Sequence, residues 1–376
     1  MANSSSFKPS RAGEIVSDRL ILSTRKGLFV AERSNGWTPR LVGFLAENVT
    51  LMFPDPRDGT WYAALNLGHF GVKLKASKDE GKTWEDRAVP AYPEGETVAT
   101  GDGKPPAPAT LKMIWSLEAG SGKRIWCGTL PGGLFHSDDG GASWELNRPL
   151  WDDPSRSGWF GGGYDTPGMH SILVDPVNPK TIRVGISTAG IWRSDDEGKS
   201  WRITATGMHA DYMPPEQKYN PLSQDVHRVV QCPAQPDYLW VQHHNGIFRS
   251  TDAGENWTHV DQAKPSGFGF AVAVHPSDPN TAWFVPAVKD ECRVPVDAKL
   301  VVSRTRDGGK TFEVLSKGLP SPSYDLDYRH CLDVDYTGRS LAFGSTTGGF
   351  WISDDAGDSW KTVSTTMPPI HAVRYG

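Results

Sequence analysis

The chain has 376 residues, of which 38% are hydrophobic and 22% charged, with 40 glycines, 29 prolines and 15 tryptophans. Its formal net charge of −5 provides no polybasic face, which argues against nucleic acid as a partner. No apolar run approaches the roughly 18 residues of a membrane-spanning helix, so we expect no membrane partner. The many glycines and prolines indicate frequent turns between short strands.

The first residues, MANSSSFKPSRAGEIVSD, are polar and lack the apolar core of a secretory signal. We therefore expect residues 1–17 to form a flexible tail and the protein to be cytoplasmic. Four cysteines lie far apart with no CxxC pair, a pattern that favours reduced thiols over disulfides or a structural zinc site.

The first expected strands follow the tail in DRLILSTRKGLFV, and from residue 77 an eight-residue motif, called the box below, recurs at intervals of 48 to 60 residues. Its copies are SKDEGKTW from Ser77, SDDGGASW from Ser137, SDDEGKSW from Ser194, STDAGENW from Ser250, TRDGGKTF from Thr305 and SDDAGDSW from Ser353. A weaker seventh copy, Gly27 to Trp37, precedes them. Periods of this length are typical of propeller blades.

Each repeat predicts a four-stranded antiparallel meander, A to D. In HSILVDPVNPKTIRVGISTAG, from His170, a β-rich run, a Pro-containing turn and a second run precede the strand that leads into the box. The box then forms the C–D hairpin. The chain starts at a strand B and ends in IHAVRYG, which matches a strand A, so the C-terminal strand should complete the N-terminal blade and close the ring. The sequence thus predicts an all-β fold, a single seven-bladed β-propeller over residues 18–376.

Turn chemistry explains the residues of the box. An aspartate such as Asp196 can accept backbone N–H groups, Gly198 can adopt positive φ, and Trp201 can bury a large face. The spacing resembles the Asp-box, or BNR, repeat of sialidases, sortilin-type receptors, xyloglucan-degrading enzymes and photosystem assembly factors. STRKGLFV and WFGGGYD further resemble bacterial BNR proteins of the sialidase-like or glycosyl hydrolase type. The resemblance implies that the boxes lie opposite the binding site and take no part in catalysis.

The D–A and B–C connections should then form the upper face, where the first residues of the A strands surround the channel. Aligning those strands gives one equivalent position with Asn48, Lys112, His170, His227, Phe270, His330 and His371. Histidine is the commonest metal ligand and a natural acid–base group near neutral pH. We consider three roles for these histidines: hydrogen bonding between blades, metal-free binding or acid–base chemistry, and coordination of one divalent transition metal (Fe, Mn, Zn or Cu) by His170, His227, His330 and His371.

Long upper loops add polar and aromatic side chains, which is a common sign of a functional region. The candidate catalytic residues are His170, His227, His330, Tyr164, Asp165 and Arg329. The candidate substrate-binding residues are Arg25, Lys112, Asp211, Tyr212, His244 and Tyr328. The insertion PAVKDECRVPVDAK contributes Lys289, Asp290, Glu291 and Arg293.

These residues favour a His-rich pocket that acts on a carbohydrate or another small molecule, as a hydrolase or lyase and with or without a metal. One alternative is a glycoside hydrolase that uses two loop carboxylates, chosen from Asp165, Asp211, Asp325 and Asp327. Sialidase activity is disfavoured, because that family carries an early Arg-Ile-Pro motif and the nearest phrase here is RVP, from Arg293. The other alternative is a non-catalytic propeller that binds a protein partner.

Overall fold

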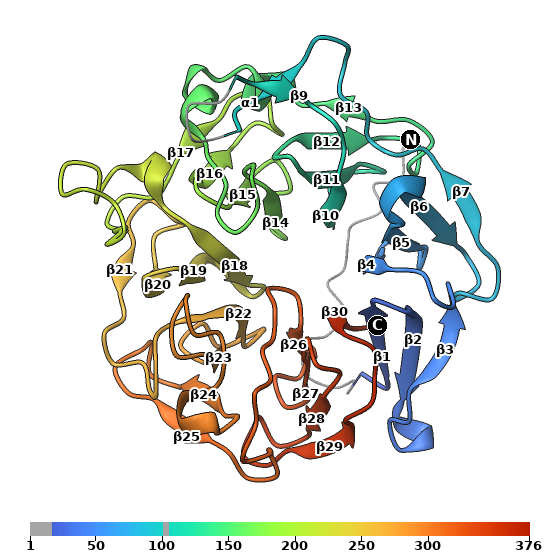
Figure 1. Ribbon diagram of the computed structural model, residues 1–376, viewed down its shortest axis with the longest axis vertical. Coiled ribbons are helices and arrows are strands. Elements are labelled where there is room, and N and C mark those ends of the chain that lie inside the picture. The colour runs from blue at the N-terminus through green and yellow to red at the C-terminus, as the bar shows by residue number, and fades with distance from the viewer. Residues whose placement is uncertain (1–16, 101–104) are drawn as a thin grey trace, which may run out of the picture.

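The computed structural model describes residues 17–100 and 105–376. Over these residues the chain forms seven four-stranded antiparallel sheets, arranged as the blades of a ring (Figure 1). The predicted seven-bladed propeller is therefore confirmed. Residues 1–16 of the predicted tail lie outside the described residues, while the Ser17 hydroxyl donates a hydrogen bond to the Gly376 carbonyl at 3.0 Å.

Each blade runs from an inner strand A to an outer strand D. The first four blades are β30 (Ile370–Tyr375), β1 (Arg19–Thr24), β2 (Gly27–Glu32) and β3 (Arg40–Gly43); β4 (Val49–Pro54), β5 (Trp61–Asn66), β6 (Val72–Ser77) and β7 (Glu85–Arg87); β10 (Met113–Ala119), β11 (Ile125–Leu130), β12 (Leu134–Ser137) and β13 (Glu145–Leu146); and β14 (Met169–Val174), β15 (Ile182–Ile186), β16 (Gly190–Ser194) and β17 (Arg202–Ile203). The last three are β18 (Val226–Cys232), β19 (Gln235–His243), β20 (Gly246–Ser250) and β21 (Thr258–His259); β22 (Gly269–Val274), β23 (Ala282–Pro286), β24 (Val302–Thr305) and β25 (Glu313–Leu315); and β26 (Leu332–Val334), β27 (Leu341–Gly344), β28 (Phe350–Ser353) and β29 (Lys361–Ser364).

The connections contain little regular structure. They hold a hairpin of β8 (Thr97–Val98) and β9 (Ala107–Pro108), the short helix α1 (Arg148–Trp151) and brief 3₁₀ turns at Arg33–Asn35, Gly68–Phe70, Pro154–Gly158, Pro221–Ser223 and Val296–Ala298. Within the described part of the chain, no helix has the length and apolar character needed to cross a membrane.

The two ends of the chain close the ring. Strand β30 pairs antiparallel with β1, with Leu20 opposite Tyr375 and Leu22 opposite Val373. Figure 1 shows the red β30 beside the dark blue β1. This pairing gives the first blade its inner strand, so that all seven blades have four strands.

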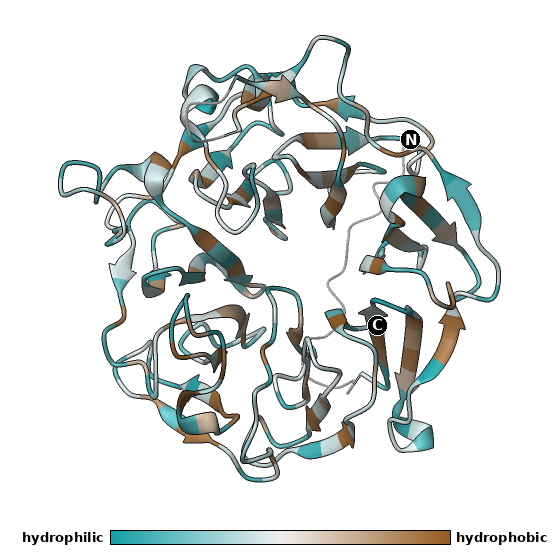
Figure 2. Cartoon of the chain, viewed as in Figure 1, coloured by the Kyte–Doolittle hydropathy of each residue, from teal (hydrophilic) through white to brown (hydrophobic). Residues whose placement is uncertain are grey.

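Hydrophobic cores lie between neighbouring blades. Trp126 of β11 is fully buried in one cluster with Ile182 and Val184 of β15, so the third and fourth blades share a core. In Figure 2 the hydrophobic segments follow the strands and the hydrophilic segments follow the connections. Apolar burial between blades stabilises the ring, and the connections remain available for other roles.

The box turns have the hydrogen bonds that turn chemistry predicts. The Ser194 hydroxyl donates to Asp196 Oδ1 at 2.8 Å, and the Gly198 N–H donates to Ser194 Oγ at 2.8 Å. Asp196 also accepts the N–H and the hydroxyl of Ser200 at 2.9 and 2.6 Å. Gly198 has φ +83°, and a Cβ there would lie 2.9 Å from the Asn147 amide nitrogen. The side chains of Ser194, Asp196 and Ser200 thus hydrogen-bond within the turn and build the hairpin.

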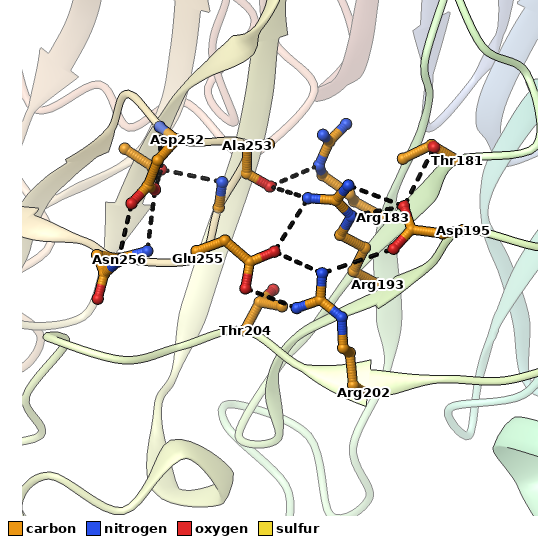
Figure 3. A network of polar contacts seen from close by, with 12 residues as sticks. Thr181, Arg183, Arg193, Asp195, Arg202, Thr204, Asp252, Ala253, Glu255 and Asn256 are labelled. Atoms are coloured by element: carbon orange, nitrogen blue, oxygen red, sulfur yellow. Dashed lines mark hydrogen bonds and ion pairs between the residues drawn. The ribbon is translucent and has the colours of Figure 1, made fainter.

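The box turns share one face of the ring with the A–B turns, because Glu197 N–H donates to the carbonyl of Lys180 at 2.9 Å. On this lower face an ion-pair network joins the fourth and fifth blades (Figure 3). Arg193 contacts Asp195 at 2.8 Å and Glu255 at 3.1 Å, and Arg202 also binds Glu255. The D–A and B–C connections consequently form the opposite, upper face.

Candidate functional site

A cavity of about 580 Å³ opens at the upper mouth of the ring. Eight of the predicted site residues line it: Tyr164, Tyr212, His227, His244, Tyr328, Arg329, His330 and His371. Asn48 and Phe270 from the aligned position, and Asp290, Glu291 and Arg293 from the insertion, line it as well. Residues from several upper loops therefore converge on this hollow, which is the arrangement expected of a ligand site.

The centre of this cavity is a buried carboxylate between two imidazoles. Asp225 immediately precedes β18 and is 6% exposed. Its Oδ2 lies 3.3 Å from His244 Nδ1 and 3.7 Å from His227 Nε2. The backbone holds this group in place, because the His244 N–H donates to the Asp225 carbonyl at 3.0 Å. We call Asp225, His227 and His244 the triad.

A glycine-rich loop packs directly against the triad. A Cβ at Gly162 would lie 2.9 Å from Asp225 Oδ2 and 2.9 Å from the Thr188 side chain. Such a contact is closer than real Cβ atoms tolerate, so the backbone approaches Asp225 this closely only because residue 162 has no side chain.

The charges of the triad follow from its burial and its contacts. Burial opposes ionisation of Asp225, but the neighbouring His227 and His244 hold its pKa well below the usual value. For His244, burial is outweighed by the hydrogen bond and charge of Asp225, so its pKa is raised. Burial dominates at His227 and lowers its pKa. Asp225 is therefore an ionised carboxylate, and His244 is the imidazole best able to share a proton with it.

Arg329 brings a second buried charge to the cavity. Its guanidinium lies 5.0 Å from the ring centre of Trp115 and 5.4 Å from that of Phe270. It is 9% exposed, and its Nε has no hydrogen-bond partner. Across residues 17–100 and 105–376, no carboxylate lies within ion-pair distance of it. A buried guanidinium in this state is well suited to an anionic ligand group.

Aromatic side chains form the walls of the cavity. Tyr164 meets Trp115 edge-on at 5.3 Å, Tyr212 meets His244 at 4.8 Å, and Tyr328 meets Phe270 at 5.8 Å. These three tyrosines are 50, 40 and 38% exposed. Partly exposed aromatic rings around a hollow can stack on the apolar faces of a ligand.

The four predicted metal-binding histidines are not brought together as one ligand set. His170 Nε2 bonds to the Val226 carbonyl at 2.7 Å, and this fully buried residue does not line the cavity. His371 Nε2 bonds to Asn48 Oδ1 at 2.9 Å, and His330 Nδ1 accepts from Arg374 at 3.0 Å. Each of these bonds reaches the next blade. Hydrogen bonding between blades, one of the three predicted roles, is therefore what His170, His330 and His371 do in this structure. Within the described residues, the group able to share an ion is instead the triad.

Four other predicted site residues lie outside this cavity. Asp165 and Lys112 are exposed and line a neighbouring hollow of about 910 Å³. Arg25 is exposed and does not line the cavity. Asp211 pairs with Lys218 at 2.6 Å and with His209 at 3.1 Å.

The two remaining loop carboxylates also lie elsewhere. Asp325 accepts hydrogen bonds from Ser323, Ser345 and Thr347, as expected of a turn-forming aspartate. Asp327 is 2% exposed, and burial raises its pKa well above the usual value. None of the four carboxylates considered for paired-carboxylate hydrolysis lines the cavity.

Sequence reasoning missed Asp225 and Trp115. Asp225 stands two residues before His227, and alternate residues of an extended chain share a face. That spacing was a usable signal in QDVH, and it went unnoticed because the alignment considered a single position of each A strand. No comparable signal marks Trp115 among 15 tryptophans.

Several xyloglucanases are similar in sequence to this chain, and no model of a known protein family matches it. An oligoxyloglucan-reducing end-specific xyloglucanase of Emericella nidulans is 23% identical over 254 residues, which cover 67% of this chain and 27% of that protein. A xyloglucanase of Paenibacillus sp is 22% identical over 280 residues, covering 67% of this chain and 26% of its own length. The chain thus spans about a quarter of these relatives.

Solved structures support the same fold. The GH74 xyloglucanase of Xanthomonas campestris superposes with a TM-score of 0.65 at 16% identity, covering 93% of this chain and 53% of that one. YCF48 bound to a D1 peptide gives a TM-score of 0.53 at 15% identity, covering 93% of this chain and 85% of its own. At such identities the likeness establishes the propeller architecture, and the function has to be argued from the site.

Proposed function

We propose that the upper cavity is the active site of a hydrolase or lyase that acts on a carbohydrate or a closely related small molecule. The observation that carries this proposal is the ionised, buried Asp225 between two imidazoles at the floor of an aromatic-walled cavity. Sequence similarity to xyloglucanases favours a carbohydrate over other small molecules.

The triad is suited to proton transfer. His244 has a raised pKa and is 22% exposed at its side chain, so it can exchange protons with a ligand in the cavity. Asp225 orients that imidazole and stabilises its protonated form, as a buried carboxylate does in acid–base catalysis. In this proposal Arg329 and the three tyrosines position the substrate.

A hydrolase with two carboxylates remains compatible with the site only through different residues from those predicted. The carboxylates that line the cavity are Asp225, Asp290 and Glu291. Asp290 is already paired with Arg293. We therefore assign the reaction to Asp225 and His244 rather than to two loop aspartates.

The proposal is tested with neutral xyloglucan oligosaccharides and with oligosaccharides that contain uronic acids. Reducing-end release detects hydrolysis, ultraviolet absorbance detects unsaturated lyase products, and saturation-transfer NMR detects binding. Asp225→Asn is expected to lower turnover by a factor of about 10² to 10⁴. Glu216→Gln changes an exposed carboxylate in the same loop outside the cavity and should leave turnover unchanged. Absence of both binding and turnover across the panel would overturn the proposal.

A further inference from the structure

The orientation of the His227 ring determines which of its nitrogens faces the other two side chains of the triad. His227 Nδ1 lies 2.6 Å from the carbonyl oxygen of Gly269. A carbonyl can only accept, so Nδ1 must carry the proton. Nε2 is then the ring nitrogen that faces the other two side chains of the triad, and it lies 3.7 Å from Asp225 Oδ2.

A separation of 3.7 Å is too long for a hydrogen bond, so His227 Nε2 and Asp225 Oδ2 face each other across a gap that no direct hydrogen bond closes. Asp225 Oδ1 is also buried and has no hydrogen-bond partner. We infer that Asp225, His227 and His244 bind one divalent first-row transition-metal ion. This inference rests on the proposed function only for the identity of the site, since metal binding is measurable without a substrate.

The spacing of the donor atoms suits such an ion. Three ligands held about 2.1 Å from a tetrahedral metal lie about 3.4 Å apart. His244 Nδ1 and His227 Nε2 lie 3.3 and 3.7 Å from Asp225 Oδ2, and all three donor atoms lie within 4.8 Å of one another. His244 follows β19 directly in the B–C turn that leads to β20.

Contacts behind the ligands match those that support metal sites. A metal-bound histidine usually donates its second ring N–H to a carbonyl or carboxylate, as His227 does to Gly269. The His227 ring also stacks on Phe270 with centroids 4.5 Å apart. His227 is therefore fixed in both tautomer and orientation before any ion arrives.

Two imidazoles and one carboxylate favour Zn²⁺, Fe²⁺ or Mn²⁺ over Ca²⁺ or Mg²⁺, which prefer oxygen ligands. Three protein ligands also leave positions open for water or a ligand in the cavity. The other histidine–carboxylate contacts in the described chain lack a third ligand: His136 meets Glu145, His209 meets Asp211, and His259 meets Asp261.

The inference is tested with the full chain after chelator treatment. Calorimetric titration with Zn²⁺ and with Mn²⁺ is expected to show one ion per chain, and Co²⁺ should give visible absorption bands of a low-symmetry, nitrogen-containing site. Asp225→Asn and His244→Ala should each weaken binding at least tenfold and remove the Co²⁺ bands. His244 is partly exposed, so its variant tests the site even if changes at buried Asp225 impair folding. His69→Ala, an exposed histidine of the upper face outside the cavity, should leave the titration unchanged.

Two results would overturn the inference: no stoichiometric binding of any of these ions, or binding that survives both Asp225→Asn and His244→Ala. Failure of the metal site is distinguishable from failure of the proposed function. Oligosaccharide turnover that persists in the chelator-treated, metal-free protein would retain the acid–base site and reject the metal. One-to-one metal binding without any oligosaccharide binding would retain the metal site and reject the proposed function.

Discussion

The lower-face box turns and the upper-mouth loops differ in how completely their polar atoms are paired. In all six boxes the aspartate accepts a neighbouring hydroxyl and backbone N–H groups, as Asp139 does from Ser137 and Ser143. At the upper mouth, buried polar atoms of Asp225, Arg329 and His330 have no partner. The hydroxyls and carboxylates of the repeated turns thus satisfy one another, and only the indole N–H groups of Trp84 and Trp360 in these boxes are buried without a partner. The irregular loops instead leave a carboxylate, a guanidinium and an imidazole with unmet hydrogen-bonding capacity around one cavity.

This difference in hydrogen-bond pairing indicates which face of the propeller carries the function. Unpaired buried polar atoms cost stability, so a chain that keeps several of them around one hollow gains something other than stability there. The lower face is a scaffold, and the upper face supports our proposed site. Variants on each face should therefore have opposite consequences, and the following predictions test that separation.

Of the variants that test this separation, Arg329→Met is expected to have the largest effect. Arg329→Met should weaken binding of a uronate-containing oligosaccharide about 100-fold, because a charged hydrogen bond to its carboxylate is lost. Its free energy of unfolding should stay the same or rise by about 1 kcal/mol, since a buried charge without a carboxylate partner is removed. Calorimetric titration and urea unfolding measure the two quantities.

The matched control is Arg40→Met on outer strand β3, where the arginine is exposed. It should change neither quantity. A large loss of stability in Arg329→Met with unchanged binding would instead make Arg329 part of the scaffold.

A smaller effect is expected at Glu118 of β10, which lines the hollow of about 500 Å³ on the lower side of His330. Burial raises its pKa to about 7, so the folded state holds this proton more tightly than the unfolded chain. The contribution of Glu118 to stability should therefore be fully present below about pH 4.5 and be lost as pH rises to about 7. Glu118→Gln should remove this decline. At pH 8 its free energy of unfolding should exceed that of the parent protein by about 1 to 2 kcal/mol.

Urea unfolding at pH 5 and pH 8 checks the Glu118 prediction. The two proteins should be similar at pH 5, where Glu118 is protonated. If the free energies of unfolding of the parent and Glu118→Gln differed equally at both pH values, the difference would come from packing rather than from ionisation.

The lower face was predictable from sequence because each box contains its own hydrogen-bonding partners within seven residues. Asp196 and Ser200 meet wherever that turn forms, so local spacing determines the geometry. The closing pair β1 and β30 was predictable because the repeat lacked one inner strand. Both deductions required only the period of the chain.

The site was predictable only in part. The loops that carry His244, Tyr212 and Arg329 were expected at the upper mouth, and they do line the cavity. The alignment of A strands could not show that His170 turns toward Val226 while His227 meets Asp225. Side-chain direction near the start of a strand depends on local bulges, and register does shift between Met169 and Ser171 and between Val226 and Arg228.

On the lower face, Asp196→Ala should lower the free energy of unfolding by about 1 kcal/mol, the usual cost of losing a side chain that caps backbone N–H groups. Ligand and metal binding at the upper mouth should not change, because the box lies at the other end of the blade. Urea unfolding and the calorimetric titrations check both parts. A tenfold loss of binding in this variant would contradict the separation of the two faces.

The smallest effect concerns the exposed box aspartates in acid. Hydrogen bonds from Ser143 and Ser137 lower the pKa of Asp139 to about 2, whereas an ordinary aspartate in the unfolded chain titrates near 3.8. A carboxylate with a depressed pKa stabilises the fold above the unfolded value, and this contribution is lost as pH falls from about 4 to about 2. Asp139→Asn cannot titrate, so its stability should decline less steeply over that interval, although it starts lower at pH 7. Thermal unfolding of both proteins at pH 7, 4 and 3 measures how steeply their stability falls with pH. Parallel curves for variant and parent would show that Asp139 is not hydrogen-bonded as an ionised group, and the account of the box as a self-satisfied turn would then fail at this copy.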